Sequence, residues 1–240
     1  GPNLAECLSM MEEAFKPGTS PDGKSYGAMV EALGATYTNR LKNMGDQDAP
    51  HAPSCTTHFS VVDRQGNMVA VTQTLLSIFG SRVVSPSTGL LMNNGIMWFD
   101  PEPGKPNSLA PDKGCLMNVC PALGEIGGRR FAIGASGGRK ILPAVLNLTS
   151  FMMDFGLDLE GAFHQPRVDN SGAEITIADE DLPAEIIASL EKIQQTVTAK
   201  RTVYPYAFAC PAGVMRENGM NTGCTEIMSP WGDAVAEKEL

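Results

Sequence analysis

The sequence predicts a layered α+β protein, and three features point to this class. Hydrophobic residues recur at helical spacing in the first 43 residues, alternate at strand spacing over residues 57–75, and form an apolar helical run after Gly138. With 42% hydrophobic and 19% charged side chains in 240 residues, the chain can build one large core or two modest ones. This composition excludes a disordered chain.

Two amphipathic helices are predicted within residues 3–43, on either side of the breaker KPGTSPDGK. The apolar positions at helical spacing are Leu4, Leu8, Met11 and Phe15, and then Tyr26, Met29, Val30, Leu33, Tyr37 and Leu41. Residues 45–55, GDQDAPHAPSC, carry two prolines and no periodicity, which predicts an exposed connector. We therefore place a boundary after Cys55, between a segment 1–55 and a segment 56–240.

A β-hairpin is predicted next. Residues 57–63 and 67–75 alternate and are rich in Val, Thr and Phe, with the turn DRQGN between them. If Asp63 and Asn67 close a three-residue loop, Thr56 is the first strand residue and stands directly opposite Thr74. Further strands are expected at residues 89–92, 129–135, 173–177 and 212–216, and helices at 138–155, 158–164 and 183–195.

Composition also excludes several classes of function. The net charge of −9 disfavours a nucleic-acid partner. The sequence contains no apolar run of about 18 residues, so no membrane span is predicted. Residues 1–15 lack the pattern of a signal peptide, which leaves the compartment open. Six scattered cysteines without a CxxC pair, and only three histidines, predict mostly buried thiols, no metal site and no cofactor.

Thr56 is the first candidate for chemistry. If the chain were cut between Cys55 and Thr56, the free α-amino group of Thr56 would lie beside its own hydroxyl and could act as its base. The alternative is that Thr56 and Thr74 form an ordinary β-branched pair in a strand. His58, two residues on, lies on the same strand face and either orients a neighbour or is a satisfied structural histidine, which we favour.

The second candidate is the segment GASGGRKILPAVLNL from Gly134, where a strand passes through Gly137 and Gly138 into an apolar helix. Backbone amides at such a helix start can hold a phosphate or the oxyanion of an acyl intermediate, or the glycines simply make a tight turn. Trp98, in the loop MNNGIMWFDPEPGKPN, either lines a pocket or caps the core. His164 and Arg167, in EAFHQPR, fit a helix end before a proline.

The residues TTHFSVVDRQGNMVAVTQTLLSIFG from Thr56 resemble the start of the small subunit of gamma-glutamyltranspeptidases and related acylases, which are N-terminal nucleophile hydrolases. The resemblance continues through GLLMNNG, GASGGRKI, DFGLDLEGAFHQPRVDN and GMNTGCTEIMSPWGDAVAE and covers residues 56–240, whereas residues 1–55 resemble the end of the large subunit. It implies a four-layer αββα sandwich, a heterodimer with a large subunit cut from the same precursor, and a periplasmic, secreted or cytoplasmic location.

The resemblance also implies roles for individual residues. Thr56 would cut the Cys55–Thr56 bond and then act as acyl-forming nucleophile on a small amide substrate. Thr74 matches the threonine that hydrogen-bonds the nucleophile, and Gly137 and Gly138 match the glycine pair of the oxyanion hole.

Departures from the family pattern fall on substrate recognition. Leu76 replaces an asparagine that binds the γ-glutamyl group, and Gly95–Trp98 replaces a stretch whose carboxylate holds the substrate ammonium. Met117 and Asn118 replace paired serines, and the short, proline-rich connection 100–115 suggests a reduced lid. Leu76, Trp98 and Asn118 are therefore the expected substrate-binding positions of a pocket that disfavours an amino-acid zwitterion.

Three hypotheses follow. The first is an amide hydrolase or acyltransferase that works through a Thr56 ester, with hydrolysis favoured because the pocket is more open. The second is a true γ-glutamyl enzyme whose recognition residues lie in the large subunit. The third is a non-catalytic scaffold, against which the retention of Thr56, Thr74 and the glycine pair argues.

Overall fold

The computed structural model describes residues 1–45, 54–172, 174–202 and 206–237. The described helices are α1 (Pro2–Ala14), α2 (Gly23–Asn43), α3 (Ile141–Met153), α4 (Leu159–His164) and α5 (Ala184–Leu190). The strands are β1 (Ser54–Val62), β2 (Met68–Ser77), β3 (Ala122–Ile126), β4 (Arg129–Ser136), β5 (Val168–Asp169), β6 (Ile175–Asp179), β7 (Gln195–Ala199), β8 (Cys210–Glu217) and β9 (Met220–Thr225). Short 3-10 helices cover Gly95–Trp98 and Gly138–Lys140.

The two N-terminal helices form as predicted, on either side of the KPGTSPDGK breaker. Helix α2 begins with a reciprocal cap, because the Asp22 carboxylate accepts from the backbone N–H of Lys24 and Ser25, and the Ser25 hydroxyl accepts from the Asp22 N–H. Pro2 opens α1, where its missing N–H costs no helical hydrogen bond. These end signals and the apolar periodicity fix the two helices locally.

Strands β1 and β2 form the predicted antiparallel hairpin. The Asp63 N–H donates to the Asn67 carbonyl across the loop, and Gly66 takes a φ of 87° that favours glycine. The register pairs Thr56 with Thr74, as predicted. The strand begins at Ser54, however, so the expectation that Thr56 opens it is wrong; Cys55 still pairs with Leu76, which prolongs the ladder by two residues.

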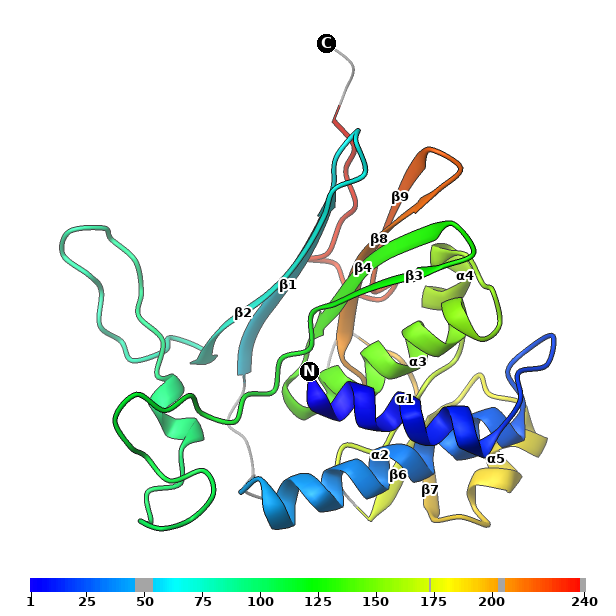
Figure 1. Ribbon diagram of the computed structural model, residues 1–240, viewed down its shortest axis with the longest axis horizontal. Helices are drawn as coiled ribbons and strands as arrows, with labels where there is room; N and C mark the ends of the chain where they lie inside the picture. Colours follow the sequence, from blue (N-terminus) through cyan, green and yellow to red (C-terminus); the bar gives the residue numbers. More distant parts are fainter. Residues whose placement is uncertain (46–53, 173, 203–205, 238–240) are drawn as a thin grey trace.

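The elements form layers around one four-stranded sheet of order β3-β4-β8-β9 (Figure 1). The β1–β2 hairpin packs on one face of this sheet, and α3 packs on the other. Helices α1 and α2 contact α3 from its outer side, and the small sheet β5-β6-β7 lies beside α2 and α5. The α+β class is confirmed; the described residues supply a helical layer, a sheet and a hairpin, so the four-layer αββα arrangement stays a prediction.

One hydrophobic core joins both sides of the predicted boundary. It contains Met11, Met29 and Leu33 from the first segment, and Phe131, Leu146 and Phe151 from the second. The Tyr26 and Phe151 rings meet edge to face with centroids 6.0 Å apart, a favourable aromatic arrangement. Segment 1–45 is therefore packed into the body that carries the candidate site, and residues 46–53 of the predicted connector lie outside the described part.

Several other expectations need correction. Residues 89–92 form no strand, only an isolated bridge between Leu91 and Val84. The helix expected at 183–195 ends at Leu190, and the chain turns into β7 at Gln195. Only Cys7 and Cys120 are buried; the other four thiols are half-buried, and all six are free. None of the described helices combines the length and apolarity that a bilayer crossing requires.

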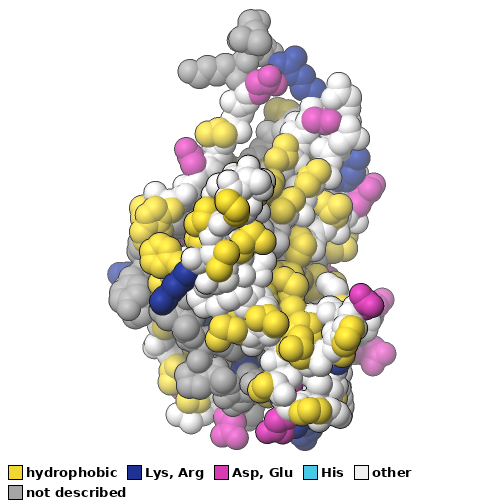
Figure 2. Space-filling model, turned by 90° about the vertical axis from the view of Figure 1, so that its left-hand side faces the viewer, with side chains coloured by type: hydrophobic (Ala, Val, Ile, Leu, Met, Phe, Trp, Pro, Cys, Tyr) yellow, Lys and Arg dark blue, Asp and Glu magenta, His cyan; other side chains and the backbone are white. Residues whose placement is uncertain are grey.

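An arm of residues 78–97 extends from the end of β2 (Figure 1) and exposes many apolar side chains. It is held together by backbone hydrogen bonds from Met92 to Val83 and from Ser85 to Leu90, both 2.9 Å long. Hydrophobic side chains are spread over the side of the molecule that bears it (Figure 2). The exposed apolar residues of this apolar arm are Ile78, Phe79, Val83, Val84, Leu90, Met92, Ile96 and Met97.

Candidate active site

The Thr74 hydroxyl links the predicted nucleophile to the predicted scissile bond. The Thr56 hydroxyl donates to Thr74 Oγ1 at 3.1 Å, and Thr74 Oγ1 donates to the Cys55 carbonyl oxygen at 2.9 Å. A third contact, from the Leu76 N–H at 2.9 Å, fixes the Thr74 oxygen. One side chain thus orients the Thr56 oxygen and withdraws electrons from the carbonyl carbon next to it.

A β-bulge lies at the same place. The pairing shifts by one residue between Cys55 and Thr56, so that Leu75 is the extra residue on β2. Leu76 then adopts a φ of 70°, a left-handed conformation that is unfavourable for a side chain other than Gly, Asn or Asp. The hairpin is therefore irregular where Cys55 meets Thr56.

Gly137 and Gly138 form the turn from β4 into the Gly138–Lys140 helix. Their φ values are 139° and 60°, and a Cβ on Gly137 would lie 2.9 Å from the Cα and Cβ of Ala209. Both positions therefore require glycine for backbone reasons. The turn and its short helix lead directly into α3, which is buried from Ile141 onward.

These residues share a cavity of about 650 Å³. Its lining comes from the end of the hairpin, from the turn after β4, and from the segments before β8 and after β9. Predicted site residues in the lining are Cys55, Thr56, Gly137 and Gly138, and further lining residues include His58, Ser136, Arg139, Lys140, Tyr206, Phe208, Cys210, Glu226 and Trp231. The structure thus brings the predicted nucleophile and the predicted glycine pair to one space.

The three expected substrate-binding residues lie elsewhere in the described part of the chain. Leu76 is on the bulge beside Thr74, and Trp98 ends the short helix Gly95–Trp98, where its carbonyl accepts from Asn107. The Asn118 Oδ1 accepts from Arg40 at 2.8 Å and borders a separate cavity of about 120 Å³. Gly138 and Arg139 line both cavities.

His58 has the contacts of a structural histidine. Its Nδ1 lies 2.8 Å from Thr72 Oγ1 and its Nε2 lies 2.9 Å from Ser60 Oγ. Its ring covers Gly134 of β4, where a Cβ would come within 2.3 Å of the ring. Burial lowers the pKa of His58 to about 4, so the ring is neutral near pH 7 and joins the hairpin to the sheet.

Cys210 is the other nucleophilic side chain of interest in the cavity. Burial raises the pKa of its thiol to about 11, and the nearby Glu226 carboxylate adds to the effect. A thiol that stays protonated is a poor nucleophile. Cys210 is therefore not an activated nucleophile in this cavity.

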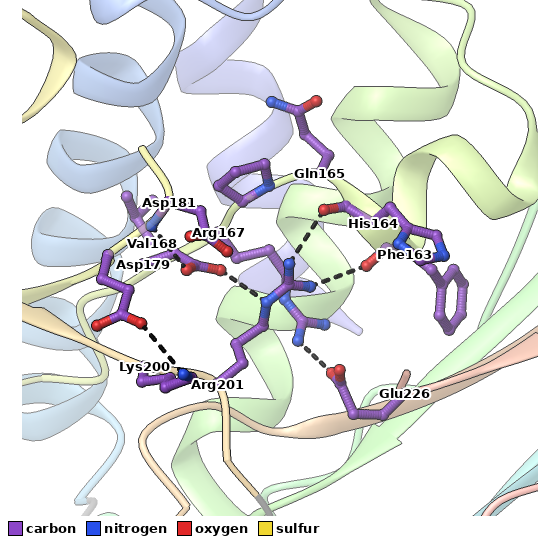
Figure 3. A network of polar contacts seen from close by, with 12 residues as sticks. Phe163, His164, Gln165, Arg167, Val168, Asp179, Asp181, Lys200, Arg201 and Glu226 are labelled. Atoms are coloured by element: carbon purple, nitrogen blue, oxygen red, sulfur yellow. Dashed lines mark hydrogen bonds and ion pairs between the residues drawn. The ribbon is translucent and has the colours of Figure 1, made fainter. Parts of the chain in front are cut away.

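Sequence reasoning missed a buried ionic network (Figure 3), which borders this cavity through Glu226. Arg167 and Glu226, 1% and 6% exposed, form an ion pair, and Figure 3 shows Arg167 directed toward Glu226 and Arg201 toward Asp179. Arg201 also donates to the carbonyls of Phe163 and His164, both at 3.0 Å. Arg167, which follows Pro166, is therefore a buried residue. A buried arginine needs a carboxylate partner, so an Arg at the start of an apolar strand could have indicated a buried ion pair.

The described residues contain no group of three or more His, Cys, Asp or Glu side chains that could hold a metal ion.

Comparison with known proteins places this geometry in context. A model of the gamma-glutamyltranspeptidase family matches residues 49–230. The chain is 35% identical over 136 residues to the acylase ACY 1 proenzyme of Pseudomonas sp. (strain V22), covering 56% of this chain and 24% of that protein. It is 35% identical over 130 residues to the glutathione hydrolase proenzyme of Escherichia coli (strain K12), covering 50% and 22%. The chain thus spans about a quarter of the length of these relatives.

Solved structures share the fold. The cephalosporin acylase from Bacillus halodurans matches with a TM-score of 0.76 and 19% identity, covering 99% of this chain and 49% of that one. The Helicobacter pylori gamma-glutamyltranspeptidase T380A mutant matches with a TM-score of 0.60 and 25% identity, covering 72% of this chain and 100% of that one.

Proposed function

The chain belongs to the gamma-glutamyltranspeptidase family, and on this premise we propose that it carries the catalytic part of an amide hydrolase or acyltransferase with Thr56 as its nucleophile. The observation that carries the proposal is the double contact of Thr74, to the Thr56 hydroxyl at 3.1 Å and to the Cys55 carbonyl at 2.9 Å. Two threonines that only pair across strands would not need a hydrogen bond from Thr74 to the carbonyl of Cys55, the residue before Thr56.

The first reaction of the proposal is the cut before Thr56. The Thr56 oxygen attacks the Cys55 carbonyl carbon while its proton passes to the departing Thr56 nitrogen, and Thr74 stabilises the negative charge on the Cys55 oxygen. The resulting ester joins Cys55 to the Thr56 oxygen. Water then hydrolyses the ester, which releases a Cys55 carboxylate and leaves Thr56 with a free α-amino group.

The second reaction is amide cleavage. The Thr56 amine takes the hydroxyl proton, and the oxygen attacks the substrate carbonyl. The amides of Gly137 and Gly138, in the same cavity, would hold the oxyanion, and the amine product leaves with the proton. Water or a second amine then attacks the acyl ester, which restores the Thr56 hydroxyl. The chain carries Leu76 and Trp98 where the family pattern has polar side chains, although neither residue lines this cavity, and we expect water to be the preferred acceptor.

A genuine γ-glutamyl enzyme is the alternative, because a relative 35% identical is named glutathione hydrolase proenzyme. Its recognition residues would then come from the large subunit. That subunit is the proposed partner in either case: the relatives are named proenzymes, and the exposed apolar arm would be covered by it. A non-catalytic scaffold is the third possibility.

Thr56→Ala in the full-length protein tests the proposal, with Thr198→Ala as the matched control. Thr198 is exposed on β7, pairs with Ala178 and does not line the cavity, so its loss should leave the reaction intact. We expect Thr56→Ala to abolish both the new N-terminus at residue 56, read by intact mass, and amide cleavage. Persistence of either activity in Thr56→Ala would defeat the proposal. Turnover of glutathione and of a γ-glutamyl anilide would favour the genuine γ-glutamyl enzyme, and its absence would favour an amide hydrolase with another substrate. A wild-type protein that is never cut before Thr56 would favour the scaffold.

A further inference from the structure

Three aromatic side chains line the cavity that contains Thr56: Tyr206, Phe208 and Trp231, here called the aromatic wall. Tyr206 and Trp231 are 44% and 74% exposed, whereas Phe208 is buried at 7% exposure. Large exposed aromatic side chains around a cavity are typical of a surface that becomes buried against a ligand. Of the two tryptophans in the chain, Trp231 therefore lies where the sequence pattern led us to expect Trp98.

Three charged side chains line the cavity beside the wall, Arg139, Lys140 and Glu226, and each is engaged within the protein. Glu226 pairs with Arg167, and the Lys140 ammonium donates to the Ala207 carbonyl at 2.8 Å and lies 3.8 Å from Asp169. Taking either group for a substrate would leave a buried partner without compensation, which is costly. Apart from the hydroxyl groups of serines and threonines in the lining, the surface that is available beside Thr56 is ring and hydrocarbon.

We propose that the aromatic wall binds the acyl group of the substrate, and that the preferred donors are amides of aromatic or branched apolar carboxylic acids. This inference rests on the proposed function, since it names the acyl group that Thr56 would take. The reaction is the same acyl transfer, in which the apolar acyl group passes from an amine to Thr56 and then to water.

The test compares three anilides in the full-length protein: acetyl, phenylacetyl and γ-glutamyl p-nitroanilide. We expect kcat/KM for the phenylacetyl donor to exceed that for the γ-glutamyl donor at least about tenfold. Trp231→Ala should lower kcat/KM for the phenylacetyl donor about tenfold and leave the acetyl donor within about twofold, because only the larger acyl group reaches the wall. Tyr206→Leu provides a second, independent variant of the wall.

The inference is overturned if the γ-glutamyl donor is the best, or if Trp231→Ala and Tyr206→Leu slow the acetyl and phenylacetyl donors equally. Thr56→Ala separates this outcome from failure of the proposed function: if that variant still cleaves the anilides, the nucleophile is wrong, whatever the wall does. Circular dichroism and the unfolding midpoint show whether each variant is folded.

A second observation, independent of the wall, concerns Tyr37 of α2. Its side chain is 2% exposed, and its hydroxyl donates to the backbone carbonyl of Arg139. Gly172 is close to the same ring, since a Cβ there would lie 3.3 Å from it. Arg139 directly follows Gly138, so a buried phenol from segment 1–45 holds the turn that carries the glycine pair.

We infer that Tyr37 is a positioning residue for the Gly137–Gly138 turn, a role that rests on the proposed function of that turn. Tyr37→Phe keeps the ring and removes the hydroxyl. Tyr26→Phe is a matched control, because Tyr26 lies on the same helix, is fully buried and donates to the Pro166 carbonyl at 2.6 Å, away from the turn.

Both variants should lose similar stability, but only Tyr37→Phe should lower kcat, about five- to tenfold with KM unchanged. Equal kcat values for the two variants, or a change in KM alone, would overturn the role of Tyr37. An inactive Thr56→Ala protein in the same assay shows that the activity measured is that of the proposed site.

Discussion

The buried ion pair between Arg167 and Glu226 allows a quantitative test of how this cavity is supported. Glu226→Ala would leave Arg167, which is 1% exposed, without its carboxylate. Asp179 cannot take the place of the lost carboxylate, because it is already paired with Arg201 at 2.7 Å. Removal of one partner of a buried pair costs about 3–5 kcal/mol.

A second pair in the same chain provides the control. Arg129 and Glu217 lie 2.8 Å apart with side chains 25% and 42% exposed, so Glu217→Ala should cost only about 0–1 kcal/mol. The chemical change is the same in both variants, and burial is the difference between them. The expected gap in the free energy of unfolding is therefore about 2–5 kcal/mol.

Urea unfolding of the full-length protein, followed by circular dichroism, measures both values. If the pair acts as described, the double variant Arg167→Met, Glu226→Leu should recover much of the loss, since two apolar side chains leave no buried charge. A Glu226→Ala protein no less stable than Glu217→Ala would refute the reasoning, because the burial of Arg167 would then carry no electrostatic cost.

Three further predictions concern the hairpin. Burial lowers the pKa of His58 to about 4, so the unfolded chain takes up the proton first as the pH falls. The free energy of unfolding should therefore decrease as the pH drops from about 6.5 to about 4. His58→Gln should flatten this dependence, which urea midpoints across that range would measure. Gly134→Ala would place a Cβ 2.3 Å from the His58 ring and should cost about 1–3 kcal/mol in thermal unfolding, whereas no loss would mean that the hairpin does not rest on β4 there. Thr74→Val should slow the cut before Thr56 about a hundredfold on gels and Thr74→Ser should not, while equal rates would exclude the Thr74 hydroxyl from the reaction.

The hairpin could be predicted to the residue because its information is local. A three-residue loop between Asp63 and Asn67 fixes the pairs of the ladder from Val62–Met68 as far as Thr56–Thr74. The bulge at Cys55 could not be predicted in this way, since loop arithmetic assumes an unbroken ladder. It depends on contacts at the far end of the strands, where the Leu76 N–H reaches the Thr74 hydroxyl.

The loss of the strand expected at residues 89–92 has a related cause. Apolar residues there satisfied a strand pattern, but a strand also needs a neighbouring strand along its length. The segment has only the isolated Val84–Leu91 bridge and a few backbone hydrogen bonds to residues 81–85. The helix expected at 183–195 was too long because Ile193 continues the apolar spacing, although Gln195 already pairs with Ile175 in a parallel ladder. The spacing of apolar residues alone does not show which strand, distant in sequence, will pair with a segment.

The same distinction separates the chemistry of the candidate site from its choice of substrate. Thr56 and Thr74 are neighbours through one hairpin, and Gly137 and Gly138 through one turn, so motifs locate them. Tyr206, Phe208 and Trp231 reach Thr56 only because β8 pairs with β4 and β9 returns along β8. A change in this long-range packing would alter which acyl group fits the proposed site and leave Thr56, the proposed nucleophile, in place. Members of one family can therefore keep the reaction while their substrates diverge, and for this chain the aromatic wall is where that divergence should be measured.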